Sequence, residues 1–522
     1  TYNDVYKDDH ILNVFGGMEL NGTDRSRSWF NGVGMQYDMG MLSNYDYRYF
    51  KQGNEENTAY YTVSRTKSRE VSFFGTATYS YQGKYTINGT MRYEGSNKLG
   101  RSRSARWLPT WNVSGAWNMH EESFFESLRP SLSNFTLKAS YSLTADRGPA
   151  NVTNSLAVIM GYNPWRPLSS VNESGLQITD LENSELTYEK KHELNIGAEV
   201  GFLENRINLA VDWYKRNNYD LIGLINTMGV GGQVSKLANV ASMESHGVEF
   251  TLSTRNISTK NFKWTTDFIF SNAKNKVTEL KSDANVMSMI SGSGFALEGN
   301  PVRSLYSLNF QGLNKEGLPT FINEKGELTV TDINFQEREN KSHLVYEGST
   351  DPTITGSFGN IFSYKGFKLN VFMTYSFGNV IRLDPVFHNA YSDLDATPRE
   401  FKNRWTVAGD EKITTVPVIA DLRQNTMNSY LNKAYNAYNY STERIAKGDF
   451  IRMKEISVTY EFPKTMVSKL SLSNLSLKIQ GTNLFLLYAD KKLNGQDPEF
   501  FNSGGVAVPV PKQFTLTLRL GI

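Results

Sequence analysis

The chain of 522 residues contains no cysteine, which excludes disulfides, thiolate metal sites and thiol chemistry. No run of 18 or more apolar residues occurs, so a transmembrane helix is excluded as well. The 55 basic and 53 acidic side chains nearly balance, which argues against a dominant nucleic-acid surface. A membrane is not excluded, because only alternate residues of each strand in a transmembrane barrel face lipid.

Motifs for catalysis and for metal binding are missing too. The six histidines lack the His-x-x-x-His spacing of a zinc site, and no Walker loop, Gly-x-Ser-x-Gly elbow or Gly-x-Gly-x-x-Gly fingerprint is present. We interpret Gly229–Gly232 as a flexible loop rather than a phosphate site. Asp393-Leu394-Asp395 is half of a calcium-loop pattern without the following Gly and Glu, so a solvated loop is favoured over calcium. We therefore expect no enzyme, no cofactor and no metal site.

Aromatic residues and strict alternation are abundant. The 28 Tyr, 30 Phe and 8 Trp could supply the aromatic girdles of an outer-membrane barrel, although a large soluble β protein could use them as well. Along Leu194–Val200 the even positions are apolar and the odd ones are Asn195, Gly197 and Glu199. Ile207–Trp213 repeats the pattern with apolar odd positions. Period two predicts β-strands, because successive side chains point to opposite faces.

The whole chain follows this pattern, and we predict an all-β fold, a transmembrane antiparallel β-barrel with about fourteen strands. Several reach the roughly 9–11 residues that a tilted strand needs to cross a bilayer. The predicted strands are 8–20, 69–82, 84–94, 105–118, 133–144, 188–201, 205–217, 245–256, 262–275, 354–364, 366–377, 448–462, 474–485 and 513–522.

Short and long connections alternate between these strands. Short turns lie near 83, 203, 259 and 365 and, less tightly, near 126 and 468, whereas the long loops are 21–68, 145–187, 218–244, 276–353, 378–447 and 486–512. This asymmetry is typical of an outer-membrane barrel with its long loops outside the cell, and it places the C-terminus in the periplasm. The alternatives are a soluble sandwich, a propeller or an adhesin. No period of 40 to 50 residues supports a propeller.

Several segments, in order, resemble a known family over nearly all of the chain. They include Phe73-Phe74-Gly75, Met91-Arg92-Tyr93-Glu94-Gly95-Ser96, Leu108-Pro109-Thr110, Ala116-Trp117, Tyr188-Glu189-Lys190, Tyr214-Lys215-Arg216, His246-Gly247-Val248-Glu249, Gly448-Asp449-Phe450-Ile451-Arg452-Met453-Lys454 and Gly481-Thr482-Asn483-Leu484-Phe485. The sequence is similar to the SusC-like (SusC/RagA) TonB-dependent outer-membrane transporters of the Bacteroidetes. It departs from them at Glu94 (usually Asp), His246 (usually Asn) and Ile522, where outer-membrane barrels usually end on Phe.

The resemblance implies a barrel of about 22 strands with an internal plug. We therefore expect residues 1–522 to be the C-terminal portion of one barrel, with the plug domain and the first strands outside this sequence. It also implies TonB-dependent import of a nutrient through the outer membrane, with a SusD-like surface lipoprotein as partner and TonB acting through the N-terminal part. An oligosaccharide is the expected cargo and an oligopeptide the alternative. A surface adhesin without transport is the alternative from another class.

Transport predicts two kinds of site residue. The barrel wall should turn polar side chains into its lumen, and the alternation assigns this role to Asn88, Arg92, Asn195, Glu199, Asn208 and Asp212. Cargo should meet aromatic and guanidinium groups in the extracellular loops, where Tyr162, Trp165 and Arg166 cluster. The simpler interpretation, that these nine residues only line a hydrated lumen or pack a loop, stays open.

Overall fold

The computed structural model describes residues 1–7, 9–31, 35–36, 42–43, 47–56, 61–98, 106–129, 131–148, 157–162, 174–183, 185–229, 234–281, 284–292, 294–391, 397–503 and 511–521. Fifteen strands of this part follow one hydrogen-bonded order. They are β1(Tyr2–Tyr6), β2(His10–Phe30), β5(Tyr61–Tyr81), β6(Tyr85–Ser96), β7(Trp107–Asn118), β8(Leu132–Asp146), β11(Glu189–Phe202), β12(Ile207–Asn226), β13(Ser235–Ser258), β14(Phe262–Leu280), β20(Ile354–Tyr364), β21(Phe367–Phe377), β24(Phe450–Glu461), β25(Asn474–Ala489) and β26(Gln513–Gly521).

The order of the strands in the sheet is their order along the chain, which is the up-and-down arrangement of a barrel. All fourteen predicted strands are confirmed, and β1 is an additional one. Among the described residues no pairing joins β1 to β26, so these two strands are the edges of the sheet. Several strands are longer than alternation alone predicted: β2 and β5 pair over their full 21 residues, from His10↔Tyr81 to Phe30↔Tyr61.

Backbone conformation at the short turns explains why the strands reverse where they do. Lys365 and Gly366 join β20 to β21 with φ of 45° and 89°. Leu203, Glu204 and Asn205, between β11 and β12, have φ of 50° to 58°. Positive φ at successive residues matches the right-handed twist of two antiparallel strands, so these turns confirm the predicted tight connections near 203 and 365.

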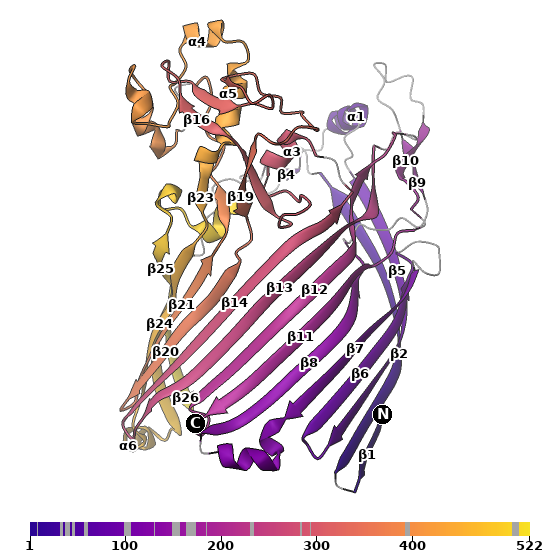
Figure 1. The fold of residues 1–522 in the computed structure, drawn as a ribbon, viewed down its shortest axis with the longest axis vertical. Coiled ribbons are helices and arrows are strands. Elements are labelled where there is room, and N and C mark those ends of the chain that lie inside the picture. The colour runs from indigo at the N-terminus through magenta and orange to yellow at the C-terminus, as the bar shows by residue number, and fades with distance from the viewer. Residues whose placement is uncertain are drawn as a thin grey trace. The chain divides into compact units, whose positions relative to one another are not determined.

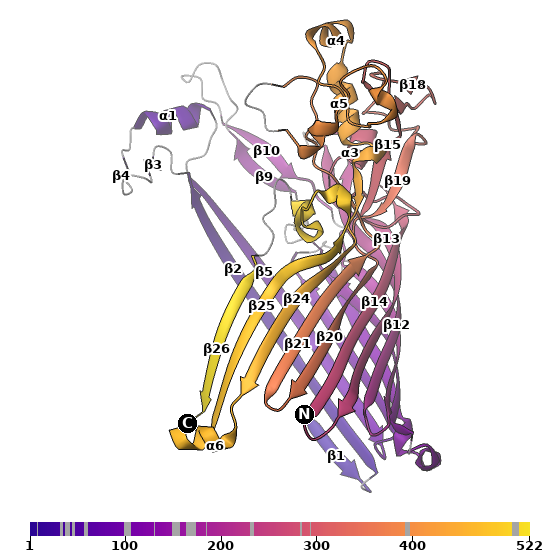
Figure 2. The ribbon, with the colours of Figure 1, turned by 90° about the vertical axis from the view of Figure 1, so that its left-hand side faces the viewer.

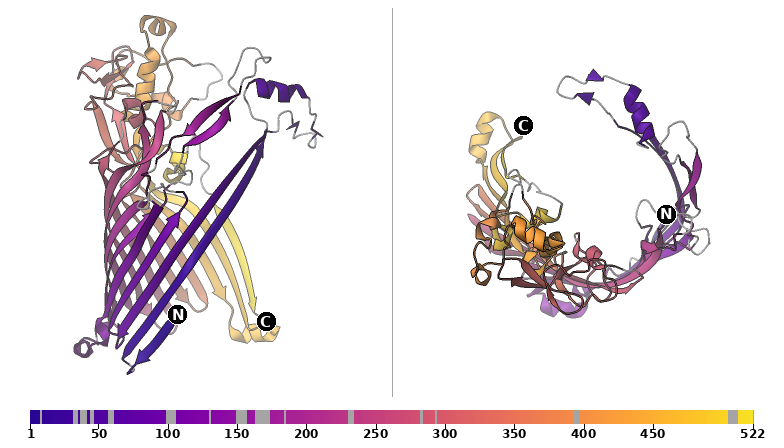
Figure 3. Two further views of the ribbon diagram at one scale, coloured as in Figure 1. Left: turned by 90° about the vertical axis from the view of Figure 1, so that its right-hand side faces the viewer. Right: turned by 90° about the horizontal axis from the view of Figure 1, so that it is seen from above.

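The chain divides into two compact units. Unit 1 comprises Thr1–Ala116, Ser140–Leu194 and Asn217–Ser242, and unit 2 comprises Trp117–Ala139, Asn195–Arg216 and Met243–Ile522. In unit 1, β2 and β5 run side by side (Figures 1 and 3), and helix α1(Tyr47–Glu55) lies beyond one end of this pair (Figure 2). Smaller pairs in this unit are β3(Met35–Gln36) with β4(Leu42–Ser43), and β9(Val158–Tyr162) with β10(Gly175–Asp180).

In unit 2, β20, β21, β24, β25 and β26 lie side by side, with the short helix α6(Lys464–Val467) at one end (Figure 2). At the other end is a folded region that we call the loop subdomain, residues 284–349 and 380–447 (Figure 2). Its elements are α3(Val286–Ile290), β15(Ser304–Leu308), β16(Phe310–Leu313), β17(Pro319–Ile322), β18(Leu328–Thr329), β19(Leu344–Ser349), β22(Val380–Arg382), α4(Leu422–Met427), α5(Leu431–Asn439) and β23(Ile445–Lys447).

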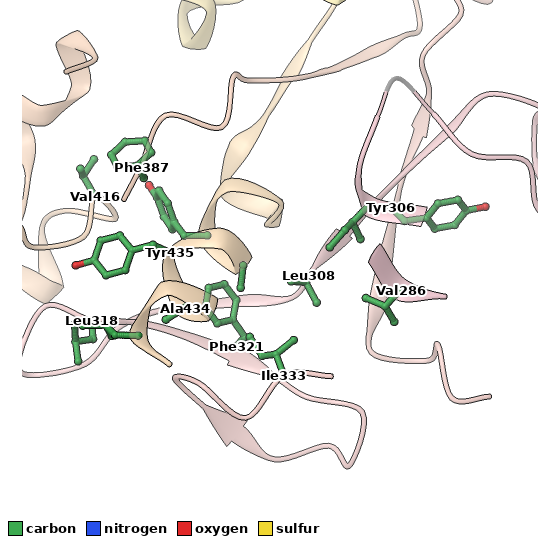
Figure 4. Close-up of a cluster of buried hydrophobic side chains, with 14 of the residues drawn as sticks. Val286, Tyr306, Leu308, Leu318, Phe321, Ile333, Phe387, Val416, Ala434 and Tyr435 are labelled. Atoms are coloured by element: carbon green, nitrogen blue, oxygen red, sulfur yellow. The ribbon is translucent and has the colours of Figure 1, made fainter. Parts of the chain in front are cut away.

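The loop subdomain has its own hydrophobic core. Phe321 of β17 is fully buried and lies beside Ala434 of α5 (Figure 4). Tyr435 is 2% exposed, and its hydroxyl donates to the carbonyl oxygen of Val418. Its long segments were predicted only as long loops, and the structure shows them packed like a small soluble domain.

Candidate functional site

In a soluble protein the apolar face of a sheet is buried and its polar face is exposed. In the large sheet of this chain the apolar face is exposed and the polar face is partly buried. On the face of each unit that we call the outer face, apolar side chains are exposed: Met91 of β6 in unit 1 is 57% exposed, and in unit 2 Ile479 of β25 is 58% and Phe514 of β26 78% exposed. Their neighbours Arg92 and Gln480 point to the other face, the polar face, and are partly buried. On the paired strands β25 and β26 the exposed Ile479 lies opposite the exposed Leu516, and contiguous exposed apolar surface of this kind marks contact with a membrane or a partner.

Hydroxyl and amide groups bond across the polar face of β5 and β6 in unit 1. Asn88 Nδ2 donates to Thr78 Oγ1 at 2.5 Å, and the hydroxyls of Thr76 and Thr90 lie 3.1 Å apart. These residues face one another because Thr78 pairs with Asn88 and Thr76 with Thr90 in the strand register. Each bond satisfies a side chain without bringing in an apolar partner, so the face stays hydrophilic.

Farther along β6 the polar face becomes charged. Arg92 Nε lies 2.8 Å from Glu94, and Arg92 Nη2 lies 2.9 Å from Glu19. Arg147 Nη1 lies 2.5 Å from Glu70, while its Nη2 is 3.5 Å from Glu94. Two guanidinium groups and three carboxylates therefore form one network. Such a network can line an aqueous path for polar solutes.

The other predicted lumen-facing residues lie on β11 and β12 in unit 2. Glu199 forms an ion pair with Lys138, and Asn208 Nδ2 donates to the carbonyl oxygen of Asn205 at 3.0 Å. Asp212 covers Gly197 so closely that a Cβ there would lie 2.3 Å from its Oδ1. Asn195 is half-buried on the same side of β11 as Glu199. The lumen role of all six residues stays a prediction.

A pocket of about 300 Å³ opens between polar side chains of unit 2. Lys368 of β21 pairs with Thr459, Thr459 with Lys478, and Lys478 with Thr517, so these four side chains form one row across four strands. Arg519 also lines the pocket. Alternation placed each residue on a face, but only the strand register shows that three cations meet here.

An aromatic row crosses four strands in unit 1. The ring centroids of Trp111 and Tyr141 lie 5.5 Å apart, those of Tyr141 and His192 5.7 Å, and those of His192 and Tyr219 5.7 Å. Tyr141 is 45% exposed. Rows of Tyr and Trp at one level of a sheet are typical of the interfacial girdle of a membrane barrel.

The predicted cargo residues are only partly within the described structure. Tyr162 is the last residue of β9 and pairs with Gly175 of β10, whereas Trp165 and Arg166 lie outside the described residues. Asp393 and Asp395 also lie outside them, as do Gly231 and Gly232. In the ranges that the structure covers, no three His, Cys, Asp or Glu side chains are grouped to hold a metal ion. No described helix is long and apolar enough to cross a membrane.

Sequence reasoning missed the buried charges of the loop subdomain. The Arg444 side chain is 4% exposed and forms an ion pair with Glu400. Burial lowers the pKa of Arg382 to about 10, and burial also raises the pKa of Glu347. Arg382 Nη2 donates to the carbonyl oxygen of Tyr306, 76 residues away, at 2.5 Å. No local pattern could reveal contacts over such separations.

Comparison with known proteins agrees with this architecture. Residues 1–484 match the family described as TonB-dependent receptor-like, β-barrel. TonB-dependent receptor P3 of Formosa agariphila is 26% identical over 445 residues, which are 82% of this chain and 42% of that protein. TonB-dependent receptor SusC of Bacteroides thetaiotaomicron is 23% identical over 495 residues, 90% of this chain and 44% of that protein.

A solved structure shares the fold as well. The structure of the RagAB peptide transporter matches with a TM-score of 0.76 and 20% identity, covering all of this chain and 54% of that one. The chain thus spans about half the length of the proteins that it matches. The fifteen consecutive strands, the exposed apolar face and the match over 484 residues lead to one assignment. The chain belongs to the TonB-dependent receptor-like β-barrel family.

Proposed function

We propose that this chain forms part of the wall of an outer-membrane importer that takes up a nutrient with energy delivered through TonB. The observation that carries the proposal is the inverted sheet: the outer face exposes Met91 in unit 1 and Ile479 and Phe514 in unit 2. In unit 1 the opposite face carries the Arg92–Glu94–Arg147 network. An apolar face suits lipid and a charged face suits a water-filled lumen. Family membership supports the same placement.

The orientation follows from the two ends of the strands in unit 2. In this proposal the loop subdomain lies outside the cell, and α6 and the C-terminus lie in the periplasm, because barrels of this kind have long loops outside and short turns inside. A SusD-like surface lipoprotein is the proposed partner at the loops, and TonB is the proposed energy source. The similarity to SusC and to the RagAB peptide transporter supports both proposals.

The proposed cargo is an oligosaccharide, with an oligopeptide as the alternative that the RagAB peptide transporter supports. Tyr162, Trp165 and Arg166 remain the proposed contacts, because aromatic rings stack on sugar rings and a guanidinium group bonds their hydroxyls. The six residues from Asn88 to Asp212 remain the proposed lumen lining. No motif in the sequence supports catalysis.

Uptake by a deletion strain tests the function. Loss of the gene should abolish uptake of one labelled class, oligosaccharide or oligopeptide, and deletion of TonB or collapse of the proton gradient should do the same. A strain that still takes up both classes but no longer attaches to surfaces would overturn the importer in favour of an adhesin. Uptake of peptides alone would move the assignment to the alternative cargo.

A further inference from the structure

The outer face of β5 changes from apolar to basic along the strand. Phe73, which is 47% exposed, and Val71 are followed on the same face by Arg69, Lys67 and Arg65, because side chains two residues apart share a face. All three basic residues are exposed. We call Arg65, Lys67 and Arg69 the outer basic ladder. Its side chains recur at intervals of about 7 Å along the strand.

Aromatic residues fix the level at which the ladder begins. Tyr93 of β6 pairs with Phe73, and its ring stacks on Trp107 with centroids 5.1 Å apart. Trp and Tyr concentrate at the headgroup level of a bilayer. Arg69 follows Phe73 by four residues on the same face, with Val71 between them, so an apolar and aromatic surface is followed by a cationic one. A bilayer presents its acyl chains, interface and phosphate groups in the same order.

In the described residues of β2 and β5, the positive charge of the outer face is only partly compensated. Gly22, Asp24 and Ser26 pair with Arg69, Lys67 and Arg65, so one carboxylate faces three cations. Asp24 accepts from Arg69 Nη1 at 2.8 Å, and Arg69 can reach it because its Cδ crosses Gly22, 3.6 Å from where a Cβ would be.

The opposite face of β5 at this level has a different charge pattern. Glu70 binds Arg147 there, and Ser68 is 7% exposed. The acidic residue of this stretch of β5 thus lies on the polar face and its cations on the outer face.

We propose that the outer basic ladder binds the phosphate groups of anionic lipid headgroups in the leaflet at the end of the β2–β5 pair where α1 lies. This inference rests on the proposed membrane placement. A guanidinium group matches phosphate oxygens with two parallel hydrogen bonds, and a lysine adds a point charge. The outward direction of the ladder and its continuity with the apolar face favour a lipid over a soluble anion, which would reach either face.

Two matched double variants test the proposal, in protein expressed from its complete gene and purified from an outer membrane. R65Q/K67Q removes two charges from the outer face and keeps the ion pair of Arg69 with Asp24. R25Q/R27Q removes two charges from the same hairpin on the opposite face, where Arg25 pairs with Thr66 and Arg27 with Ser64. Each protein is placed in nanodiscs of neutral phosphatidylcholine that contain either diphosphorylated lipid A or its dephosphorylated form.

The wild type should bind diphosphorylated lipid A, and R65Q/K67Q should bind it roughly 30-fold more weakly, because each basic residue near an anionic surface strengthens binding about fivefold. R25Q/R27Q should bind like the wild type. Equal binding by all three proteins would overturn the proposal, as would equal loss in both variants. Stabilisation of the wild type by millimolar inorganic phosphate alone, with no preference for phosphorylated lipid, would also overturn it.

Two further readouts keep the test decisive. Should R65Q/K67Q fail to fold, the wild type still has to prefer phosphorylated over dephosphorylated lipid A, and the absence of this preference contradicts the ladder. A wild-type protein that enters neither nanodisc contradicts the proposed membrane placement itself. Insertion without a phosphate preference contradicts only the lipid site.

Discussion

Strand β25 and the loop subdomain, both in unit 2, use the same kinds of residue in opposite ways. Ile479 of β25 is 58% exposed, whereas Ile290 of α3 is fully buried. Phe485 is 47% exposed, and Phe321 is fully buried. The loop subdomain hides its apolar side chains from water as any soluble domain does, while the sheet presents them outward. Under the proposed membrane placement, this difference follows from two solvents acting on one chain, lipid on the strands and water on the loops.

The largest expected effect comes from removing a buried aromatic ring from the core of the loop subdomain. Phe321→Ala should destabilise the loop subdomain by about 3–5 kcal/mol, because the lost ring leaves a cavity. Limited proteolysis and hydrogen exchange of residues 284–349 and 380–447 would measure this loss. Phe73→Ala, which removes a ring from the outer face of β5, should leave protection of the loop subdomain unchanged. Equal deprotection by both variants would contradict the independent core.

A charge placed on the sheet tests the proposed lipid contact. Ile479→Arg should reduce the stability of the inserted protein by about 2–4 kcal/mol if this residue lies near the bilayer midplane. Gln480→Arg, one residue farther along β25, turns the same charge to the polar face and should change stability by less than about 0.5 kcal/mol. Urea unfolding from detergent micelles or vesicles measures both. Similar losses would show that the two faces meet the same environment.

The difference between the two regions also explains what the sequence could reveal. Alternation identifies β25 because each residue from Leu475 to Ile479 meets its environment independently, so the pattern is local. Tyr435 and Phe321 have no such pattern, because they belong to a core that joins segments more than 100 residues apart in the chain, as where Phe321 lies beside Ala434. The extension of β5 to Tyr61 was missed because Val63 is the only aliphatic residue from Thr62 to Arg69, which is too little apolar signal to reveal period two.

The candidate site divides in the same way. Alternation along β6 is enough to put Asn88 and Arg92 on one face. It could not show that Arg147 joins Glu70 and Glu94, because that contact depends on a side chain from the end of β8. The row from Lys368 to Thr517 likewise requires the register of four strands. The sequence does not determine which residues of neighbouring strands lie close together, and contact with cargo depends on those neighbours.

A third prediction compares a mostly buried carboxylate of the polar face with an exposed one. Glu94 is 15% exposed and contacts both Arg92 and Arg147, so Glu94→Gln should destabilise the protein by about 1.5–3 kcal/mol, the range for hydrogen bonds to charged groups. Glu19 is 52% exposed and contacts Arg92, so Glu19→Gln should change stability by at most about 1 kcal/mol. Chemical unfolding of both variants measures the two changes in the free energy of unfolding. An equal effect would contradict a graded network.

The smallest effect concerns pH and the loop subdomain alone. His343 is 6% exposed, and burial lowers its pKa below the ordinary 6.5, outweighing the attraction of Glu324 and Glu337. The folded state therefore holds a neutral ring. Below pH 6.5 this histidine binds a proton in the unfolded chain, whereas in the folded chain it does so only below its lowered pKa. The contribution of the neutral ring to stability is therefore complete above pH 6.5 and is lost as the pH falls through the folded pKa. His343→Gln should abolish it.

Measurement of the wild type alone cannot isolate that contribution, because Glu347 acts in the opposite direction. Burial raises the pKa of Glu347, so its stabilising effect is complete below its ordinary pKa and is lost as the pH rises through the raised value. The informative quantity is the difference in melting temperature of the loop subdomain between wild type and His343→Gln. From pH 7.5 to 5.5 the melting temperature of the wild type should fall more than that of His343→Gln. The contribution of Glu347 is the same in both proteins and cancels in the difference. A difference that does not change with pH would show that the ring of His343 is hydrated and lies outside the hydrophobic core of the loop subdomain.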